Sequence, residues 1–198
     1  MTATSDQSPN QLLTAAVHSF RTPQSQPRPD GKTLTAALLQ AEKAAKQTRQ
    51  SLSLESLLGT WRLCFSAGKG AKLQSGEPIG NGFYIPKLAI ARITFSRSEA
   101  SGHSLGVKNE LYIGPLTVQF TGPARYPGKK NLLAFDFTHL QLRCFGLTVY
   151  SGKVGKRDNQ AFAKTPIAKL PFFAFFAATE DYIAARGRGG GLAIWIRE

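Results

Sequence analysis

Cysteine and histidine, from which disulfide frameworks and many metal sites are built, are scarce in this chain. Its 198 residues include two cysteines and three histidines. Two thiols are too few for the disulfide framework of a small secreted domain, so we expect Cys64 and Cys144 to be small hydrophobic residues in strands, with a single bridge as the alternative. His18, His103 and His139 lie too far apart in the sequence to form a metal-ligand motif. We therefore expect no metal, no other cofactor and no catalytic histidine.

Long apolar runs are also missing. No uninterrupted run approaches the ~18 residues that a membrane-spanning helix needs, and the longest, 170–178, contains Pro171. The chain does not begin with a basic segment followed by an apolar one, as a signal peptide does. Residues 1–31 are instead rich in Ser, Thr, Pro and Gln, and we expect a leader that is disordered or partly helical. Only Arg21 and Arg28 supply the basic charge that a transit peptide needs there.

Acidic side chains are few as well. Twelve Asp and Glu stand against 25 Lys and Arg, which gives a formal net charge of +13. Residues 1–58 carry six basic and four acidic side chains and residues 59–198 carry 19 and 8, so the excess belongs to the part expected to fold. This charge favours an anionic partner such as acidic lipid headgroups, nucleic acid or an acidic protein, while solubility alone is the alternative. No dense Lys/Arg block typical of nucleic-acid-binding arms occurs, so we expect no nucleic-acid partner.

Helix signals concentrate in the first 50 residues. Ser8-Pro9 is a start signal for a short helix over 8–20. The clearest helix is 33–50, for which Thr33 or Thr35 is the expected N-cap. Its apolar residues recur at intervals of three and four and form one narrow stripe, which comprises Leu34, Ala37, Leu38, Ala41 and Ala45. We expect the stripe to pack on the outside or the closed end of a domain that spans 32–198.

After Leu58 the pattern changes to that of strands. In 59–66, Trp61, Leu63 and Phe65 alternate and are expected on one face. Further strands are predicted at 88–96, 107–113, 116–121, 132–140 and 142–150. The apolar runs 172–183 and 191–197 flank a glycine-rich turn and predict a closing hairpin. The glycine-rich segment 67–86 is expected to lie over one end of the sheet as a lid.

About eight sequential strands without an intervening helix predict a mainly β protein. Because antiparallel edges must be hidden, we expect a closed up-and-down barrel with an N-terminal helical extension, and a β-sandwich is the alternative. Eight strands also make a barrel of the size that holds one small apolar ligand.

The residues at the two ends of the predicted barrel resemble a known family. Gly59-Thr60-Trp61 at the first strand and an Arg-bearing last strand are similar to the lipocalin-like (calycin) barrels. More specifically, 58–63 after a helix, together with 182–187 and 191–197, resembles the plastid lipid-associated protein (fibrillin) family, over residues 33–198. Ala184 and Ala185 depart from that family's more polar pattern. The short leader favours a cyanobacterial-type member.

The resemblance implies a non-catalytic protein that carries or organises isoprenoid lipids, carotenoids or quinones in photoprotection. It implies a peripheral location on the cytoplasmic side of thylakoids, or on thylakoids and lipid globules (plastoglobules) inside a plastid. In lipocalin-like barrels an Arg of the last strand stacks on the first-strand Trp and closes the barrel. The motif positions here are Gly59, Trp61, Arg186, Gly187, Gly191 and Arg197, with Arg197 and Arg186 as the candidates for that stacking role.

The candidate ligand-binding residues are the large apolar side chains expected to face the barrel interior. They are Trp61, Phe65, Phe95, Leu111, Val118, Phe120, Phe135, Phe137, Phe173 and Phe175. An aromatic wall suits a hydrophobic small molecule or lipid, because burying its apolar surface contributes about 25 cal/mol per Å². The alternative is that these side chains simply fill the interior.

A basic segment, 151–170, is the candidate membrane-docking region. Its cationic residues are Lys153, Lys156, Arg157, Lys164 and Lys169, and Val154, Phe162 and Ile167 stand between them. Each Lys or Arg near an anionic bilayer contributes about 1 kcal/mol. The alternative is an ordinary solvated loop.

Two other classes of function remain open. An enzyme-like calycin, such as a bilin lyase or a small-molecule isomerase, requires Glu110, Asp136 or His139 to point inward. A nucleic-acid-binding barrel requires exposed aromatic residues among basic ones on an outer sheet face.

Overall fold

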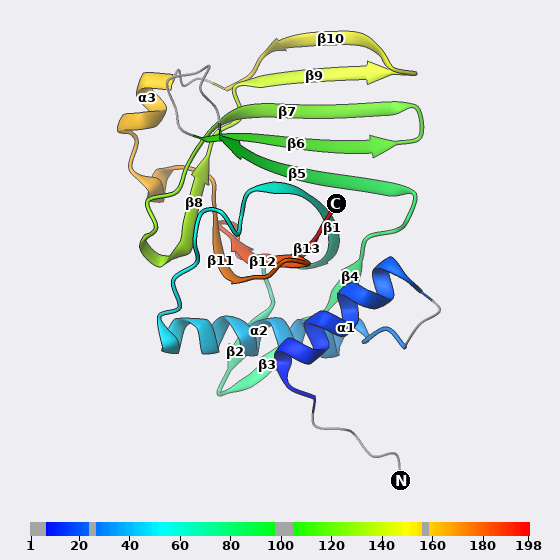
Figure 1. The fold of residues 1–198 in the computed structure, drawn as a ribbon, viewed down its shortest axis with the longest axis vertical. Helices are drawn as coiled ribbons and strands as arrows, with labels where there is room; N and C mark the ends of the chain where they lie inside the picture. The colour runs from blue at the N-terminus through cyan, green and yellow to red at the C-terminus, as the bar shows by residue number, and fades with distance from the viewer. Residues whose placement is uncertain (1–6, 24–26, 98–104, 156–158) are drawn as a thin grey trace.

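The computed structural model describes residues 7–23, 27–97, 105–155 and 159–198 (Figure 1). The helices are α1 (Pro9–Arg21), α2 (Gly31–Thr48), α3 (Asn159–Lys164) and the short 3-10 helices η1 (Lys129–Asn131) and η2 (Ile167–Lys169). The strands are β1 (Gly59–Ala67), β2 (Lys72–Gln74), β3 (Glu77–Ile79), β4 (Gly82–Tyr84), β5 (Ala89–Arg97), β6 (Leu105–Ile113), β7 (Leu116–Arg125), β8 (Leu132–Phe135), β9 (His139–Cys144), β10 (Leu147–Lys153), β11 (Phe172–Ala178), β12 (Tyr182–Gly187) and β13 (Leu192–Arg197). Among the described residues, no helix combines the length and the apolar composition that crossing a membrane requires.

Eight antiparallel strands form a closed barrel, as the sequence predicted. Their order is β7-β6-β5-β1-β13-β12-β11-β8, and β8 returns to β7. The closing contact is short and pairs Ala124 with Phe135 and Arg125 with Ala134. The chain is mainly β with an N-terminal helical part, and the sandwich alternative is excluded.

The sheet divides at β7. The last residues of β7 pair with β8 and close the barrel, whereas Leu116–Thr121 of β7 pair with β9, which in turn pairs with β10. In Figure 1 the β9–β10 hairpin therefore lies beyond β7, on the side away from the closed ring. Part of the sheet formed by β5, β6, β7, β9 and β10 thus extends past the barrel, with β10 as its edge.

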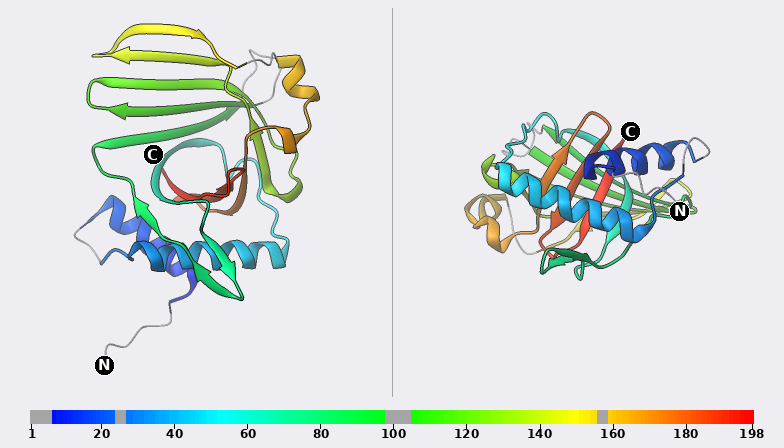
Figure 2. Two further views of the ribbon diagram at one scale, coloured as in Figure 1. Left: turned by 180° about the vertical axis from the view of Figure 1, so that it is seen from behind. Right: turned by 90° about the horizontal axis from the view of Figure 1, so that it is seen from below.

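Helices α1 and α2 cover the outer face of the wall formed by β1 and β11–β13, as Figure 2 (right) shows. Their apolar stripes share one buried cluster with outward-facing strand residues such as Cys64, Ile194 and Ile196. The predicted packing of α2 on the outside of the domain is confirmed. Helix α1 lies within the predicted leader, and its Leu13 and Val17 are fully buried in the same cluster.

The helix starts follow from local capping. Ser8 and Gln11 form a reciprocal capping box at α1. At α2 the cap is Asp30, whose carboxylate accepts from the backbone N–H of Lys32 and of Thr33, both at 2.9 Å. The predicted cap at Thr33 or Thr35 is therefore wrong, because Asp30 lies earlier and starts the helix at Gly31.

Three predicted strands are each interrupted: 132–140 ends as β8 at Phe135 and resumes as β9 at His139, and the other two contain a turn. The run 172–183 divides into β11 and β12 at a turn. A hydrogen bond from the Thr179 N–H to the Tyr182 carbonyl, at 2.9 Å, closes this turn. The run 142–150 divides at Phe145 and Gly146, both of which have positive φ. The second turn gives the β9–β10 hairpin its exposed tip.

A β-bulge reverses the expected orientation of one site residue. The register of β1 with β13 shifts between Leu63 and Phe65. Phe65 consequently points outward, where its ring lies 5.1 Å from that of Tyr84 in the cluster under the helices. The prediction that Phe65 faces the barrel interior is wrong.

The glycine-rich segment is not a lid over the sheet as predicted. Its middle part folds into the β2–β3 hairpin and into β4, which pairs with β1. Ala71 is buried in the cluster under the helices, and the Tyr84 hydroxyl donates to the Pro29 carbonyl at 2.9 Å. These contacts hold the segment beside α2.

Candidate apolar site at the barrel mouth

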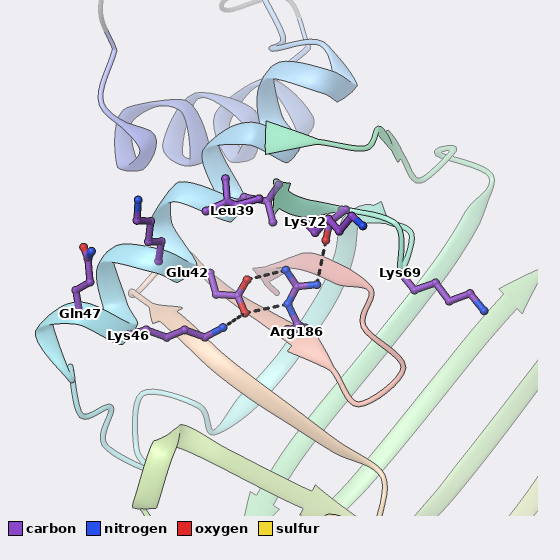
Figure 3. A pocket seen from close by; sticks show the side chains of 10 residues that line it. Leu39, Glu42, Lys46, Gln47, Lys69, Lys72 and Arg186 are labelled. Atoms are coloured by element: carbon purple, nitrogen blue, oxygen red, sulfur yellow. Dashed lines mark hydrogen bonds and ion pairs between the residues drawn. The ribbon is translucent and has the colours of Figure 1, made fainter. Parts of the chain in front are cut away.

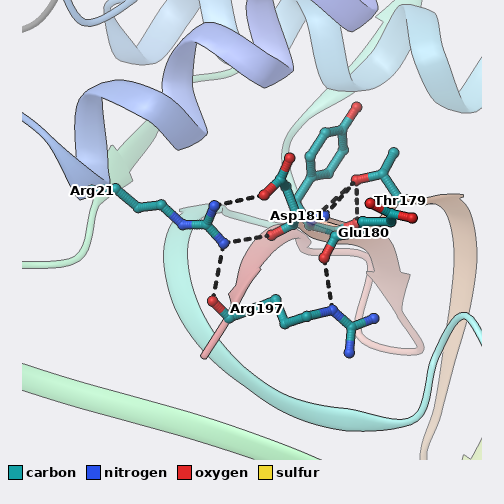
Figure 4. Close-up of polar contacts among 6 residues, drawn as sticks. Arg21, Thr179, Glu180, Asp181 and Arg197 are labelled. Carbon is teal, nitrogen blue, oxygen red and sulfur yellow. Dashed lines mark hydrogen bonds and ion pairs between the residues drawn. The ribbon is translucent and has the colours of Figure 1, made fainter.

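One end of the barrel is closed by the Trp and Arg that the family resemblance singled out. The Trp61 Nε1–H donates to the Leu57 carbonyl at 2.9 Å, and the Arg197 guanidinium carbon lies 4.0 Å from the Trp61 ring centroid. Arg197 also donates to the Leu58 carbonyl at 3.1 Å and to the Glu180 carbonyl at 2.7 Å, the latter shown in Figure 4. The stacking role expected of Arg197 or Arg186 is therefore taken by Arg197.

Gly59 is required at this closed end for two reasons. Its φ is +122°, and a Cβ built on it would lie 2.8 Å from Nη1 of Arg197. Helix α1 is tied to the same end, since Arg21 pairs with the Asp181 carboxylate at 2.6 Å and donates to the Arg197 carbonyl at 3.0 Å (Figure 4). The closed end is thus a rigid structural unit.

The other three motif residues lie around the β12–β13 turn. The Gly187 N–H donates to the Gly191 carbonyl at 2.9 Å and closes the turn. Arg186 points away from the barrel interior and pairs with Glu42 of α2 at 2.6 Å. Arg186 therefore fastens the helix layer and does not close the barrel.

The inner part of the barrel is filled by its own aromatic side chains. The ring centroids of Phe95 and Phe175 are 6.0 Å apart, and those of Phe173 and Trp195 are 5.2 Å apart in an edge-to-face arrangement. The gap between the innermost side chains has no space for a water-sized sphere, and it is bounded by Ile93, Phe95, Phe173, Phe175, Ile183 and Trp195. Ligand pockets usually measure about 300–1,000 Å³. Trp61, Phe95, Phe135 and Phe175 are therefore core residues, and the interior formed by these side chains has no room for an enclosed isoprenoid.

The opposite end of the barrel is an open mouth. It forms a hollow of about 450 Å³ whose wall is largely apolar. The lining comes from β1, the turn after it, β11 and the β12–β13 hairpin, and consists of Leu63, Ser66, Lys69, Phe173, Gly187, Gly189, Gly191, Leu192, Ala193 and Trp195. Trp195 belongs both to this lining and to the packed core below.

The strand register continues this apolar face beyond the mouth. Ile93 faces the interior, so its cross-strand partners Asn109, Phe120 and Leu140 share that face. Towards the hairpin tips, the same face carries a set of side chains that we name the apolar extension: Leu111, Ile113, Leu116, Val118, Leu142, Leu147 and Tyr150. Leu147 is 73% exposed and Ile113 54% exposed. Leu111 and Val118 thus lie on the predicted face but outside the packed interior.

A chain of aromatic rings joins the mouth to the apolar extension. The centroids of Phe173 and Phe135 are 5.1 Å apart, those of Phe135 and Phe137 5.3 Å, and those of Phe137 and Phe120 5.4 Å. Phe120, Phe137 and Phe173 are only partly buried. Of the predicted ligand-binding residues, these three together with Leu111 and Val118 are placed where a molecule arriving from outside would touch them.

The tips beside the apolar extension are apolar too. Phe145 in the β9–β10 turn is 83% exposed, Val149 63%, and Leu88 just before β5 92%. Sequence reasoning missed Phe145 and Val149 because it assigned 142–150 to one strand, and it placed Leu88 inside the strand 88–96, whereas β5 begins at Ala89. Gly146, which follows Phe145, was the signal for a turn there.

The polar residues of the enzyme alternative do not converge. Glu110 and His139 lie on the other face of the sheet, where Glu110 pairs with Lys108 at 3.1 Å and His139 contacts the Ser151 hydroxyl at 2.9 Å. Asp136 accepts from the Phe137 N–H at 3.1 Å at the joint between β8 and β9. In the part of the chain that the structure describes, no three His, Cys, Asp or Glu side chains gather as metal ligands would.

The predicted membrane-docking segment is only partly placed. Lys156 and Arg157 lie outside the described residues. Lys153 ends β10, at the end of the hairpin opposite to its exposed tip, while Lys164 and Lys169 are exposed on α3 and η2. Phe162, however, is fully buried against Ala134 and Leu170, and Ile167 packs on them. The apolar residues of this segment therefore anchor it to the protein.

Comparisons of this chain with protein-family models and with curated proteins find no match. The fibrillin resemblance accordingly remains a prediction from the motif residues. The fold itself, a closed eight-stranded antiparallel barrel, is calycin-like and compatible with binding a small molecule.

Proposed function

We propose that this protein is a non-catalytic, peripheral lipid-binding barrel that holds an isoprenoid or other lipid tail along its mouth and apolar extension. The observation that carries the proposal is the single apolar face that begins at Trp195 and Phe173 and runs, uncovered, to the hairpin tips. A long hydrocarbon needs a long apolar surface more than it needs polar partners. This arrangement replaces the enclosed guest expected from the sequence.

The energetics support an apolar occupant. Large apolar patches are rare on soluble monomers and mark surfaces that bind a partner, a ligand or a membrane. Covering this face with a lipid tail contributes about 25 cal/mol per Å² of apolar surface removed from water. The aromatic rings at Phe120, Phe137 and Phe173 add flat, rigid contact surface.

Docking on a bilayer follows from the same geometry. The tips at Leu88, Phe145 and Leu147 project apolar side chains at one end of the sheet, and the chain carries a net charge of +13. On the polar face of the same sheet, the cationic Arg143 lies two residues before the exposed Phe145 of this tip. An anionic lipid surface would satisfy both features. In line with the family resemblance, we place that surface on thylakoids or lipid globules and link the role to photoprotection.

Vesicle flotation tests this function. Full-length protein should float with vesicles of phosphatidylcholine and phosphatidylglycerol, less with phosphatidylcholine alone, and less as salt is raised. The double variant Phe145→Ser, Leu147→Ser should lose flotation, whereas Ile79→Ser, which changes an exposed apolar residue on the β2–β3 hairpin, outside the mouth and the extension, should keep it. Equal flotation of both variants would contradict the proposed surface.

Extraction of the natively expressed protein gives an independent check. A co-purifying pigment, quinone or lipid in the wild type but not in the double variant supports the proposal. Recovery of nucleic acid, or turnover of a small molecule without bound lipid, would favour one of the other two classes of function.

A further inference from the structure

A second hollow, of different chemistry, adjoins the barrel mouth. It lies between α2, β2 with the turn before it, and the β12–β13 hairpin, and measures about 490 Å³ (Figure 3). Its lining consists of Leu39, Glu42, Lys43, Lys46, Gln47, Lys69, Ala71, Lys72, Leu73 and Arg186. Five of these side chains are cationic and one is anionic, so the lining has a formal net charge of +4 (5 − 1). We refer to it as the basic pocket.

The floor of the basic pocket is a fixed ion pair. Arg186 donates from Nε and Nη2 to the two Glu42 carboxylate oxygens at 2.9 and 2.6 Å, and Lys46 donates to the same carboxylate at 2.8 Å. Arg186 also donates to the carbonyls of Ala71 and Gly190. The Glu42 charge is therefore already neutralised within the protein.

Three lysines of the pocket have no such partner. Among the described residues, Lys43, Lys69 and Lys72 form no ion pair, and all three are exposed. Lys69 and Lys72 lie on the segment whose Ala71 carbonyl accepts from Arg186, and Figure 3 shows the Lys69 side chain extending away from Arg186. The pocket thus keeps an unbalanced positive charge that suits a compact ligand group with more than one negative charge.

The basic pocket and the mouth are neighbours. Lys69 lines both of them, and the turn around Gly190 lies between them. A Cβ placed on Gly190 would lie 3.3 Å from the Cβ of Lys69, so the two segments are in direct contact. An anionic group held by these lysines would therefore have an apolar surface directly beside it.

We infer that the ligand is an anionic amphiphile whose phosphate monoester headgroup occupies the basic pocket while its tail lies in the mouth. The tail position rests on the proposed function, whereas the headgroup position rests on the basic pocket alone. The basic pocket could take its phosphate group either from a phospholipid headgroup or from free phosphate. The structure favours the phospholipid, because Lys69 lines both the basic pocket and the mouth.

Calorimetric titration with three probes separates these sources. Dihexanoyl phosphatidic acid supplies headgroup and tail, dihexanoylglycerol the tail alone and inorganic phosphate the headgroup chemistry alone. Because Trp61 also fluoresces, the part of the fluorescence change that is lost in Trp195→Phe reports on the mouth. We expect phosphatidic acid to bind at least about tenfold more tightly than either other probe, since both hollows contribute. The triple variant Lys43→Gln, Lys69→Gln, Lys72→Gln should lower that affinity at least about tenfold, and the double variant Lys43→Gln, Lys72→Gln, which leaves the lining of the mouth intact, should not change the binding of dihexanoylglycerol.

The matched control removes three exposed positive charges elsewhere, at Lys32, Lys129 and Lys130, by the same Lys→Gln change, and should keep the wild-type affinity. Equal affinity for phosphatidic acid and dihexanoylglycerol, or an unaffected triple variant, would overturn the headgroup site and leave the proposed function standing. Phosphate binding as tight as phosphatidic acid would overturn the amphiphile and leave only an anion site. If neither lipid binds, the proposed function fails together with the inference.

Discussion

The two walls of this barrel both carry an apolar inner face, but those faces end in opposite environments. The wall of β1 and β11–β13 has apolar side chains on both faces, which are covered by the barrel core on one side and by α1 and α2 on the other, so that Ile183 and Ile194 are completely buried. The sheet of β6, β7, β9 and β10 has one polar face, and its apolar face loses its cover beyond the mouth. There Ile113 is more than half exposed. Alternation decides which side chains share a face, and the topology decides whether that face becomes core or binding surface.

The largest effect should come from removing the same side chain from each wall. Ile183→Ala, in the packed interior, should lower the free energy of unfolding by about 3 kcal/mol, because it leaves a cavity. Ile113→Ala, on the apolar extension, should change it by less than about 0.5 kcal/mol and should weaken vesicle binding. Urea unfolding of both variants measures the contrast. If Ile113→Ala proved as destabilising as Ile183→Ala, the extension would be part of the core and not a binding surface.

A somewhat smaller effect is expected at the closed end. Gly59→Ala should cost about 2 kcal/mol, because the new Cβ meets Nη1 of Arg197 and the backbone has φ +122°. Gly68→Ala, with open space around it and no positive φ, should cost almost nothing and serves as the control. Thermal unfolding of both variants, together with the near-ultraviolet circular dichroism of Trp61, provides the measurement. An unchanged Trp61 signal and stability in Gly59→Ala would remove the argument that the Arg197–Trp61 stack closes this end.

The ion pair that holds α2 on the covered wall predicts a pH dependence. Burial disfavours the Glu42 carboxylate, but the hydrogen bonds and charges of Arg186 and Lys46 outweigh it and hold the pKa of Glu42 below its ordinary value of 4.5. A lowered pKa contributes stability that is complete above pH 4.5 and is lost as the pH falls through the lower, folded-state pKa. Glu42→Gln should therefore cost about 2 kcal/mol near neutral pH and progressively less below that pH.

Chemical denaturation across the acid range measures this difference. Glu55→Gln, which removes a carboxylate that is 66% exposed in its pair with Arg97, should give a much smaller difference at every pH. If the difference in free energy of unfolding between the wild type and Glu42→Gln stayed constant down to strongly acidic pH, the charge of Glu42 would not be its cause.

Much of the barrel was predictable because its strands alternate clearly. The predicted runs 88–96, 107–113 and 116–121 match β5, β6 and β7 at their cores. Phe65 was misassigned because it stands in an uninterrupted apolar run, in which alternation gives no face. Every residue in Leu63-Cys64-Phe65 is apolar. The bulge that turns Phe65 outward therefore depends on the pairing of β1 with two other strands: β13, which is distant in the sequence, and β4, which was not predicted from it.

The candidate site was harder to predict than the fold, for a related reason. Phe95 and Phe120 look alike in the sequence and stand on β5 and β7, the two strands on either side of β6, yet one is buried in the core and the other borders the exposed face. That difference arises where β7 divides between β8 and β9, a long-range event. The basic pocket was missed as well, because Lys43, Lys72 and Arg186 come from three separate segments and form no local motif.

The two cysteines test the contrast between the walls with the least perturbation of all, since both are free and one lies in each region. Cys64 is buried beneath the helices, and this burial raises the pKa of its thiol to about 12, so it should not react with a maleimide in the native protein. Cys144 is partly exposed and shares a face with the apolar extension, next to Leu116 and Leu147, so it should react. Anionic vesicles should protect Cys144 if lipid covers the extension, and mass spectrometry after proteolysis identifies the labelled residue. A thiol within a lipid-covered face cannot stay accessible to a water-soluble reagent. If the protein floats with vesicles but Cys144 is labelled equally fast with and without them, the bilayer contacts another surface.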